Sequence, residues 1–418
     1  MRADNPPAWP SASALRSPLP ESTDVLIVGG GLAGTALAYY LARAGVECVL
    51  VERAELNREA SGTNAGSFHF QIALHQLTAL ETGNVRERLQ TEVRLHAEAA
   101  EVWKTLEQEL AGSLEIHITG GLMVAETAEE LRLLHEKREL EEGAGLETHV
   151  LEGEELRDFA PYLADDLLGA TWCPDEGHAN PMLAAPLFAA RAADAGAELR
   201  THAEVTRIEV DPDGGARRFT VGTTADGSAH VSGTQGSIRA HRVVNATGAW
   251  ANEVGALVGL RLPIRAEGLH LNVTEPRERV LEPMVQHIGR RLTLKQSTTG
   301  TFIIGGGWPA NPEPPPGRFS TTWESTAGNV AVAVRVLPLL ARVRIVRTWS
   351  GVMAFTADLA PIVGESARLP GFHTLIATTG FTLSPLLAQL LAEELATGRA
   401  TIPPQYSADR TPVGQPTT

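Results

Sequence analysis

Cysteine is almost absent from this chain, since only Cys48 and Cys173 occur among its 418 residues. Two cysteines are too few for a disulfide framework, a four-cysteine zinc site or a four-cysteine iron–sulfur cluster. The 13 histidines show no metal-binding spacing such as H-E-x-x-H. We therefore expect a protein that binds no metal.

Long apolar runs and an excess of basic charge are also missing. No apolar run reaches the roughly 18 residues that a membrane span requires. Asp and Glu number 50 against 35 Lys and Arg, which gives a net charge of −15 and argues against nucleic acid as the main partner. Residues 1–22 are rich in Pro, Ala and Ser and lack the apolar centre of a signal peptide. These absences predict a cytoplasmic protein that begins with a flexible tail.

The remaining composition is that of a globular protein, with 43% hydrophobic and 20% charged residues. At roughly 100–200 residues per domain, the length allows two or three domains.

An early segment of the chain predicts a βαβ unit that binds a dinucleotide. An apolar run over 25–28 leads into Gly29-Gly30-Gly31-Leu32-Ala33-Gly34, a helical pattern follows, and a second apolar run over 48–51 ends at Glu52. In this G-x-G-x-x-G pattern Gly29 permits the tight turn, Gly31 lets the backbone approach a pyrophosphate, and Gly34 lets the helix pack closely on the strand. The helix N-terminus offers free N–H groups to phosphates, and Glu52 can accept hydrogen bonds from a ribose.

That motif alone fits NAD or FAD, but three later segments favour FAD. The polar loop 58–66 follows the second strand, where it can lie along a pyrophosphate and reach a flavin ring. A strand over 242–245 runs into Ala246-Thr247-Gly248-Ala249-Trp250, and a strand over 374–377 runs into residues 378–384. A helix is predicted to begin at Pro385, with its positive end toward the N1/O2 side of a flavin. A nicotinamide enzyme would not need these three segments.

Together the segments resemble the FAD-dependent D-amino acid oxidase and glycine oxidase family from Asp24 to about Gly398. Further motifs are similar to the flavoprotein β-subunits of opine oxidases and opine dehydrogenases, and to those of dye-linked proline dehydrogenase and hydrogen cyanide synthase. These motifs are Ser61-Gly62-Thr63-Asn64-Ala65-Gly66, Leu292-Thr293-Leu294-Lys295-Gln296, Ile304-Gly305-Gly306-Gly307-Trp308, residues 349–358 and residues 361–364.

The resemblance implies an α/β fold in which a Rossmann-like FAD-binding domain is interleaved with an α+β substrate domain built on a mixed or antiparallel sheet. After a flexible tail of residues 1–22, the FAD-binding domain would take residues 23–77, 153–252 and 345–418. The substrate domain would take residues 78–152 and 253–344. Within them, apolar spacing predicts a long amphipathic helix over 88–110, a helix over 183–195 and a strand over 205–210.

The resemblance also implies noncovalent FAD. Sarcosine-type relatives attach their flavin to a cysteine in this region of the family, and residues 352–358 of this chain contain none. By family analogy the backbone of Val205 meets the adenine. The residues predicted to contact FAD are Gly29, Gly31, Leu32, Ala33, Gly34, Glu52, Arg53, Ser61, Gly62, Asn64, Ala65, Gly66, Val205, Ala246, Gly248, Trp250, Gly380, Phe381 and Thr382.

Three residues are candidates for a role at the flavin or the substrate. Met353 stands where amino acid oxidases of the family carry an arginine for the substrate carboxylate, a bidentate contact that Met cannot imitate; Arg290 or Arg291 is a candidate replacement. Lys295 lies in a stretch similar to one in which sarcosine oxidases place a lysine beside the flavin to promote reaction with oxygen; the alternative is a solvated lysine on an edge strand. His69 follows the flavin-facing loop, and either enters the active site as a neutral imidazole or is a hydrogen-bonded structural histidine.

The predicted reaction is FAD-dependent oxidation of a CH–NH bond in an amino acid or an N-substituted, opine-like amino acid. In the family a hydride passes from the amine carbon to flavin N5, and the resulting imine is hydrolysed. The chain carries no iron–sulfur site and no second G-x-G-x-x-G motif, so a dehydrogenase of this kind would need a partner subunit that carries electrons onward. A stand-alone amine or D-amino acid oxidase that uses oxygen is the alternative. An NAD(P)H-dependent flavin hydroxylase and a flavin-holding scaffold subunit are weaker alternatives.

Overall fold

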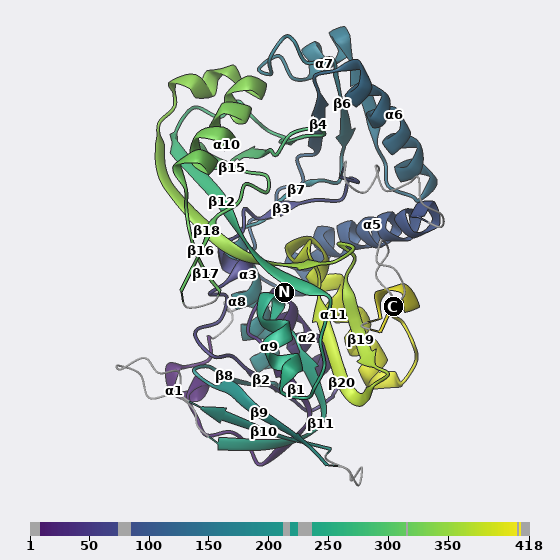
Figure 1. Cartoon of the computed structure of the whole chain (residues 1–418), viewed down its shortest axis with the longest axis vertical. Coiled ribbons are helices and arrows are strands. Elements are labelled where there is room, and N and C mark those ends of the chain that lie inside the picture. The colour runs from purple at the N-terminus through teal and green to yellow at the C-terminus, as the bar shows by residue number, and fades with distance from the viewer. Residues whose placement is uncertain are drawn as a thin grey trace, which may run out of the picture.

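Two eight-stranded sheets organise the chain, and each is assembled from segments that lie far apart in the sequence (Figure 1). The computed structural model describes residues 9–73, 85–211, 218–224, 236–314, 317–407 and 409–410. The long strands β12 (Ile264–Pro276) and β18 (Ile345–Thr356) run from the upper part of Figure 1 toward the first sheet below. This arrangement confirms the expected α/β fold with a mixed second sheet.

The first sheet contains the βαβ unit. Its strand order is β19-β20-β11-β1-β2-β8, parallel except for β19 at one edge, and β10 and β9 extend it as an antiparallel meander from β11. The strands are β1 (Ser22–Val28), β2 (Cys48–Val51), β8 (Glu198–Arg200), β9 (Glu204–Val210), β10 (Phe219–Thr224), β11 (Gly236–Asn245), β19 (Ile362–Ser366) and β20 (Leu369–Ile376).

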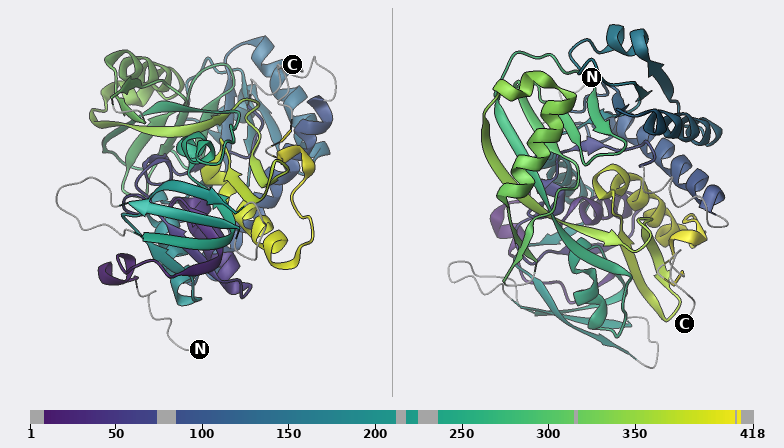
Figure 2. Two further views of the ribbon diagram at one scale, coloured as in Figure 1. Left: turned by 60° about the horizontal axis from the view of Figure 1, so that its bottom comes forward. Right: turned by 45° about the horizontal axis from the view of Figure 1, so that its top comes forward.

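Both faces of this sheet are covered, which explains why β1 and β2 read as continuous apolar runs. Val25 and Ile27 belong to the core shared with helices α2 (Leu32–Arg43), α8 (Pro181–Asp194) and α11 (Gly380–Thr397). Leu26 and Val28 point to the opposite core, which includes Phe219 of the meander. The left view of Figure 2 shows the teal strands of the meander lying across the purple βαβ unit.

The second sheet has the order β18-β12-β15-β14-β13-β4-β6-β5 and is antiparallel apart from the parallel pair β13 and β4. Its other strands are β4 (Gly121–Ala125), β5 (His149–Glu152), β6 (Gly169–Cys173), β13 (Met284–His287), β14 (Thr293–Gln296) and β15 (Thr301–Gly305). Helices α6 (Ala128–Gly143), α7 (Gly153–Phe159) and α10 (Trp323–Val336) pack against it. The remaining elements are α1 (Ala12–Leu15), α3 (Ala60–Thr63), β3 (Ser67–Phe68), α5 (Val85–Glu109), β7 (Gly177–His178), η2 (Gly248–Trp250), α9 (Ala251–Ala256), β16 (Asn311–Glu313), β17 (Arg318–Ser320), η3 (Pro338–Arg342) and η4 (Pro404–Tyr406).

The hydrogen bonding differs from the expected domain ranges at three places. Strands β6 and β18 fall in the ranges assigned to the FAD-binding domain, yet both pair within the second sheet. Residues 9–22, expected to be a flexible tail, contain α1 and are tied to β8 and the residue after it, since Arg200 Nε donates to the Pro18 carbonyl at 3.1 Å and the Thr201 N–H donates to the Leu15 carbonyl at 2.9 Å. The expected boundary between residues 77 and 78 lies outside the described residues.

The helix expected over 88–110 is observed as α5, and its Trp103 is fully buried. The expected start of the last helix at Pro385 is wrong. Helix α11 begins at Gly380, so Pro385 lies in its second turn. A proline near a helix start removes one N–H group and leaves the carbonyl four residues earlier, here that of Phe381, without its usual partner. In the part of the chain described, no helix is both long and apolar enough to cross a membrane.

Candidate functional site

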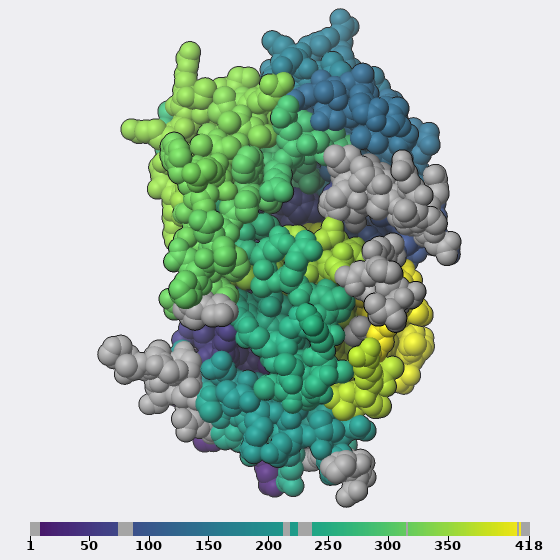
Figure 3. Space-filling model, in the orientation of Figure 1, coloured from purple at the N-terminus to yellow at the C-terminus, as the bar shows by residue number. Residues whose placement is uncertain are grey.

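A cavity of about 980 Å³ is lined by residues of both sheets and of the loops between them. It begins at the glycine loop after β1, passes the N-terminus of α11, and reaches strands β12, β13, β14 and β18 of the second sheet. Figure 3 shows a recess near the middle of this face of the molecule, with dark purple early-chain atoms at its floor and green atoms beside it. Its volume is at the upper end of the range of roughly 300–1,000 Å³ for ligand pockets.

The glycine loop requires glycine for reasons visible in its contacts. Gly29 has φ +115°, and a Cβ there would lie 2.6 Å from the Ala246 carbonyl oxygen. A Cβ at Gly34 would lie 2.0 Å from the Gly29 carbonyl oxygen, so this residue permits α2 to approach the loop. Gly31 lines the cavity next to Ser61, whose Oγ accepts a hydrogen bond from the Leu32 N–H at 2.9 Å.

Glu52, at the end of β2, lines the cavity and organises the backbone around it. Its Oε2 accepts from the Gly30 N–H at 2.7 Å, and its Oε1 accepts from the Ala54 N–H at 2.8 Å. Burial raises the pKa of the Glu52 carboxyl, and the two backbone hydrogen bonds oppose that shift. The carboxylate oxygens have further lone pairs with which to accept a ligand hydroxyl.

The loop after β2 holds its shape through Asn64. The Asn64 amide donates to the carbonyls of Ala60 at 2.9 Å and Ser61 at 2.7 Å, and its Oδ1 accepts from the Gly66 N–H at 2.6 Å. These bonds present the backbone of residues 64–66 to the cavity. Elsewhere in the lining the Arg53 guanidinium stacks 4.0 Å from the centre of the Trp250 ring. Val205 and Gly248 also line the cavity.

Helix α11 points its N-terminus at the cavity. Its N-cap residue, Thr379, makes no side-chain capping hydrogen bond, so the first backbone N–H groups of the helix remain available to an electron-rich ligand. Thr382 fixes the neighbouring loop, because its Oγ1 accepts from the His69 N–H at 3.2 Å and its carbonyl accepts from Trp103 Nε1 at 2.8 Å.

The structure brings most of the predicted cofactor contacts into one cavity. Those that line it are Gly29, Gly31, Ala33, Glu52, Arg53, Ser61, Asn64, Ala65, Gly66, Val205, Ala246, Gly248, Trp250, Gly380, Phe381 and Thr382. Leu32, Gly34 and Gly62 are not among the lining residues. Gly62 and Gly34 instead allow close backbone approach, since a Cβ at Gly62 would lie 2.0 Å from the Asn57 carbonyl oxygen.

The three candidates for catalysis occupy different positions. Met353 and His69 line the cavity, whereas Lys295 lies directly behind the lining at Gly66, where a Cβ would be 3.3 Å from its Nζ. Lys295 is only 4% exposed and its strand β14 pairs on both sides, so the alternative of a solvated edge lysine is wrong. Burial lowers the pKa of Lys295 to about 7. Burial also lowers the pKa of His69 to about 4, which keeps the imidazole neutral near pH 7.

The two arginines proposed to replace the missing cation differ in their partners. Arg290 Nη2 lies 2.7 Å from Glu126 Oε2, and Arg335 binds the same carboxylate. Arg291 also lines the cavity, but its guanidinium has no ion pair within the described ranges. Arg291 is therefore the cation of this pair that is available to an anionic ligand.

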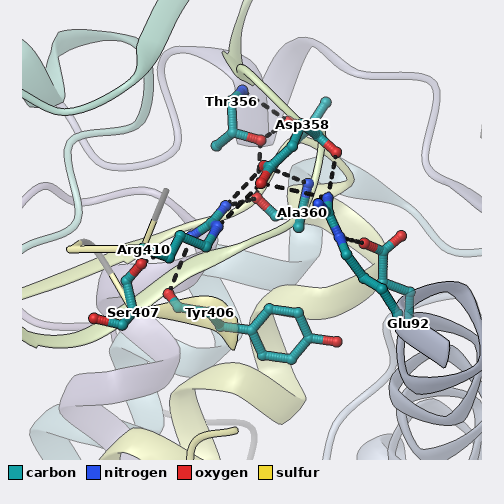
Figure 4. A network of polar contacts seen from close by, with 9 residues as sticks. Glu92, Thr356, Asp358, Ala360, Tyr406, Ser407 and Arg410 are labelled. Atoms are coloured by element: carbon teal, nitrogen blue, oxygen red, sulfur yellow. Dashed lines mark hydrogen bonds and ion pairs between the residues drawn. The ribbon is translucent and has the colours of Figure 1, made fainter. Parts of the chain in front are cut away.

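A turn on the cavity wall is held by a buried ion-pair cluster (Figure 4). Asp358 binds Arg410 from the C-terminal segment, with Nη2 to Oδ1 at 2.8 Å, and Arg88 from α5, with Nη2 to Oδ2 at 3.3 Å. Arg88 also pairs with Glu92, which lines the cavity. Leu359, the next residue of the turn, has φ +63° and lines the cavity, so the cluster stabilises a strained backbone there.

Sequence reasoning missed a group of polar residues behind His69. Gln71 and Gln286 line the cavity, and fully buried Glu176 lies between their side-chain amides. Glutamines carry no motif, and these residues are more than 100 positions apart, so local patterns contain no signal for them. No set of three or more His, Cys, Asp or Glu residues in the described ranges is arranged to hold a metal ion.

A glycine-rich dinucleotide loop joined through one cavity to a second, mixed sheet defines a flavin-dependent oxidoreductase. The chain belongs to the FAD dependent oxidoreductase family, DAO, which it matches over residues 24–394. FAD is therefore its cofactor, and the family resemblance of the motifs is confirmed. The residues present fit this group, since the Gly31 backbone, Glu52 and the uncapped end of α11 all border the same cavity.

Individual relatives give the family context. The chain is 30% identical to mouse mitochondrial sarcosine dehydrogenase over 397 residues, which cover 91% of the chain but 40% of that protein. It therefore spans well under half the length of the sarcosine and dimethylglycine dehydrogenases that it matches. It is 26% identical to an opine oxidase subunit of Rhizobium meliloti over 389 residues, covering 90% of the chain and 94% of that relative.

Solved structures agree with this assignment. L-Proline dehydrogenase from P. horikoshii superposes with a TM-score of 0.81 and 25% identity, covering 93% of this chain and 98% of that one. Glycine oxidase from Geobacillus kaustophilus superposes with a TM-score of 0.78 and 24% identity, covering 94% and 100%, and shows the shared fold.

Proposed function

We propose that this protein oxidises a C–N bond in an amino acid or an N-substituted, opine-like amino acid. Bound noncovalently, FAD would supply the hydride acceptor, and water would then hydrolyse the imine to a carbonyl compound and an amine. The observation that carries the proposal is the single cavity that joins the glycine loop to His69, Arg291 and Met353. The similarity to sarcosine dehydrogenase, to the opine oxidase subunit and to L-proline dehydrogenase supports this substrate class.

The residues around the substrate end suit an amino acid with an apolar or bulky extension. Arg291 offers a guanidinium without a protein carboxylate partner in the described ranges, and charge-assisted bonds to a substrate carboxylate would orient it. Met353, on β18, gives the cavity an adaptable apolar wall where an arginine would restrict it.

We also propose that electrons leave through a partner subunit. The similarity to the opine oxidase subunit over 94% of its length supports this, because that relative is one chain of a larger enzyme by its name. Both cysteines are buried, and neither lines the cavity, so neither is placed to pass electrons from the cofactor. A stand-alone oxidase remains the second candidate, favoured by the position of Lys295 behind Gly66.

Anaerobic mixing of the FAD-loaded protein with opines, D-amino acids, L-proline and sarcosine tests the proposal. At least one of these amines should bleach the flavin absorbance, whereas NADH and NADPH should not. Reduction by NAD(P)H alone would favour a hydroxylase, and reduction by none of the compounds would favour a scaffold subunit.

The same assay tests whether Arg291 binds the substrate carboxylate. For the best amino acid, Arg291→Leu should raise KM by about 10- to 150-fold, the range for one lost hydrogen bond to a charged group. Arg290→Leu is the matched control, because Glu126 already occupies that guanidinium, and it should change KM far less. Equal effects of the two substitutions would contradict the assignment of Arg291.

Purification from the native host tests whether the protein has a partner subunit. Purification from the native host without a tag on any neighbour should yield an active species that contains a second chain. An active species containing this chain alone, and turning over quickly with oxygen, would establish the stand-alone oxidase instead.

A further inference from the structure

A chain of buried hydrogen bonds runs from a lysine in α6 to the cavity. Lys137 Nζ donates to Gln71 Oε1 at 2.7 Å, and Gln71 Nε2 donates to Glu176 Oε2 at 2.8 Å. Gln286 Nε2 lies 3.4 Å from the same Glu176 oxygen, and Gln286 Oε1 lies 3.0 Å from His69 Nδ1. Lys137 and Glu176 are fully buried, while Gln71, Gln286 and His69 line the cavity.

Lys137 determines which group donates and which accepts in each hydrogen bond of this series. A lysine ammonium has three N–H groups and no acceptor, so the Gln71 atom facing Lys137 must be the carbonyl oxygen. The hydroxyl of Thr171, 2.7 Å from the same oxygen, is free to donate to it as well. The Gln71 amide nitrogen must then face Glu176, whichever way an isolated glutamine would be oriented.

Glu176 in turn determines which end of the Gln286 side-chain amide faces it. Its Oε1 already accepts from the backbone N–H groups of Phe70 at 2.9 Å and Gln71 at 3.0 Å, and its Oε2 accepts from the Gln71 amide. Burial raises the pKa of Glu176 to about 7, so above that pH the group is a carboxylate, which can only accept hydrogen bonds. It then selects the N–H₂ end of Gln286, which leaves the carbonyl end of Gln286 toward His69. Since that carbonyl can only accept, His69 Nδ1 must carry the hydrogen.

We propose that Glu176, acting through Gln286, holds His69 in the Nδ1–H tautomer, so that His69 Nε2 presents a hydrogen-bond acceptor to the substrate amine. The identity of the ligand as an amine rests on the proposed function. The Nε2 atom has no hydrogen-bond partner among the described residues, and His69 lines the cavity. An acceptor there binds a substrate N–H, whereas the opposite tautomer would oppose it with an N–H of its own. Glu176 and Gln286 are positioning residues in this scheme, and His69 is the residue that contacts substrate.

The tautomer can be measured directly without any substrate. In the FAD-loaded protein labelled with ¹⁵N-histidine, the NMR signals that disappear in His69→Gln identify His69. At a pH well above 7, where Glu176 is ionised, its Nδ1 should have the shift of a protonated ring nitrogen, and its Nε2 that of an unprotonated one. Gln286→Leu should remove this preference, while Gln108→Leu, an exposed glutamine of α5, should preserve it. A protonated Nε2 in the unmodified protein, or an unchanged tautomer in Gln286→Leu, overturns the proposal.

A pair of substitutions separates the acceptor from simple packing. His69→Gln can place an amide oxygen near the position of Nε2, whereas His69→Asn can replace only the Nδ1–H that bonds Gln286. The proposal predicts at least about a tenfold lower kcat/KM for Asn than for Gln, the effect of roughly one lost hydrogen bond. Equal values overturn the role of Nε2. If no amine reduces the unmodified enzyme, the proposed function fails, while the NMR result still decides the tautomer.

Discussion

At the scale of single residues, Glu52 has a second, structural role that its motif does not predict. The sequence places it at the ribose, and the structure adds two backbone hydrogen bonds that fix the glycine loop through Gly30 and the following turn through Ala54. The charge of Glu52 therefore serves both the loop and any hydroxyl ligand.

Replacing this charge should weaken cofactor binding. In Glu52→Gln an amide N–H₂ replaces one acceptor, so FAD affinity should fall by about 10- to 150-fold, measured by fluorescence titration of the apoprotein. Glu55→Gln, an exposed carboxyl three residues away that binds His202, is the matched control and should leave affinity unchanged. Equal affinities of the two variants would show that Glu52 does not act on the cofactor.

The position of Lys295 predicts an effect on the rate at which oxygen reoxidises the flavin. Its position behind Gly66 and its burial predict that Lys295→Met slows anaerobic reduction by the amine only slightly, but slows reoxidation by oxygen strongly. Because burial lowers the pKa of Lys295 to about 7, the ammonium is present below that pH and is lost above it. Reoxidation of the unmodified protein should therefore slow as the pH rises through about 7, and that of Lys295→Met should not. Lys104→Met, a surface lysine paired with Asp175, is the control. Equal slowing of both half-reactions in Lys295→Met would remove its special role.

The residues that local patterns identify are those whose partners lie nearby in sequence. Gly29, Gly31 and Glu52 fall within one βαβ unit, and all three line the cavity, whereas Gly34 packs against the loop behind it. His69 could be singled out, but its partner Gln286 lies 217 positions away and Glu176 lies 105 positions from Gln71. Only the pairing of distant strands brings these side chains together.

At the scale of elements, close packing of α2 on the glycine loop positions the cofactor end of the cavity. The helix can approach because Gly34 lacks a side chain, and a Cβ would lie 2.0 Å from the Gly29 carbonyl oxygen. That contact involves backbone on the opposing side, so it cannot be relieved by a rotamer change.

Gly34→Ala should therefore lower stability by about 1–3 kcal/mol or more, the usual cost of overpacking, and weaken FAD binding. Thermal unfolding with and without FAD measures both effects. Gly143→Ala at the end of α6 is the control, because a Cβ there has open space and should be neutral or slightly stabilising. A Gly34→Ala protein with unchanged melting temperature would contradict this packing account.

The start of α11 illustrates where element boundaries escape the sequence. Pro385 is favoured in a first helical turn, which predicts a start there. The helix begins at Gly380 instead, and Thr382 is already tied to His69 and Trp103 by tertiary hydrogen bonds. Packing therefore decides the boundary, and the predicted contacts Gly380, Phe381 and Thr382 line the cavity from the first turn of the helix and not from a loop before it.

At the scale of the whole molecule, segments that lie far apart in the sequence meet around the cavity. Residues of the C-terminal segment and of α5 meet at Asp358, on the turn that carries Leu359 (Figure 4). The second sheet likewise takes β18 from late in the chain and β4 from early in it. The family motifs predict that segments of the two domains alternate along the chain, but they do not predict that β6 and β18 belong to the second sheet.

Breaking this cluster should loosen the cavity wall. Arg410→Gln removes the hydrogen bonds of one cation to buried Asp358 and leaves Arg88 in place, so the free energy of unfolding should fall by about 1–3 kcal/mol at pH 7. Arg410 lowers the pKa of Asp358, against the effect of burial, so the stabilisation is present above the ordinary aspartate pKa and is lost as the pH falls through the lowered folded value. Urea unfolding should show the difference from the unmodified protein narrowing below about pH 4. Arg399→Gln, on an exposed arginine, is the control. Equal stability of the two variants at pH 7 would contradict the role of the cluster.

The central claim is that the cavity oxidises a C–N bond, and the products of one anaerobic turnover test it most directly. With the amine that reduces the flavin, chemical analysis should find one equivalent of imine or of its hydrolysis product for each FAD reduced. Hydrolysis of an open-chain imine consumes one water and gives one carbonyl compound and one ammonia or amine, whereas a cyclic imine such as that from L-proline opens to a single amino-carbonyl compound. A flavin that is reduced while the amine is recovered unchanged, or a hydroxylated product that retains its C–N bond, would contradict the account.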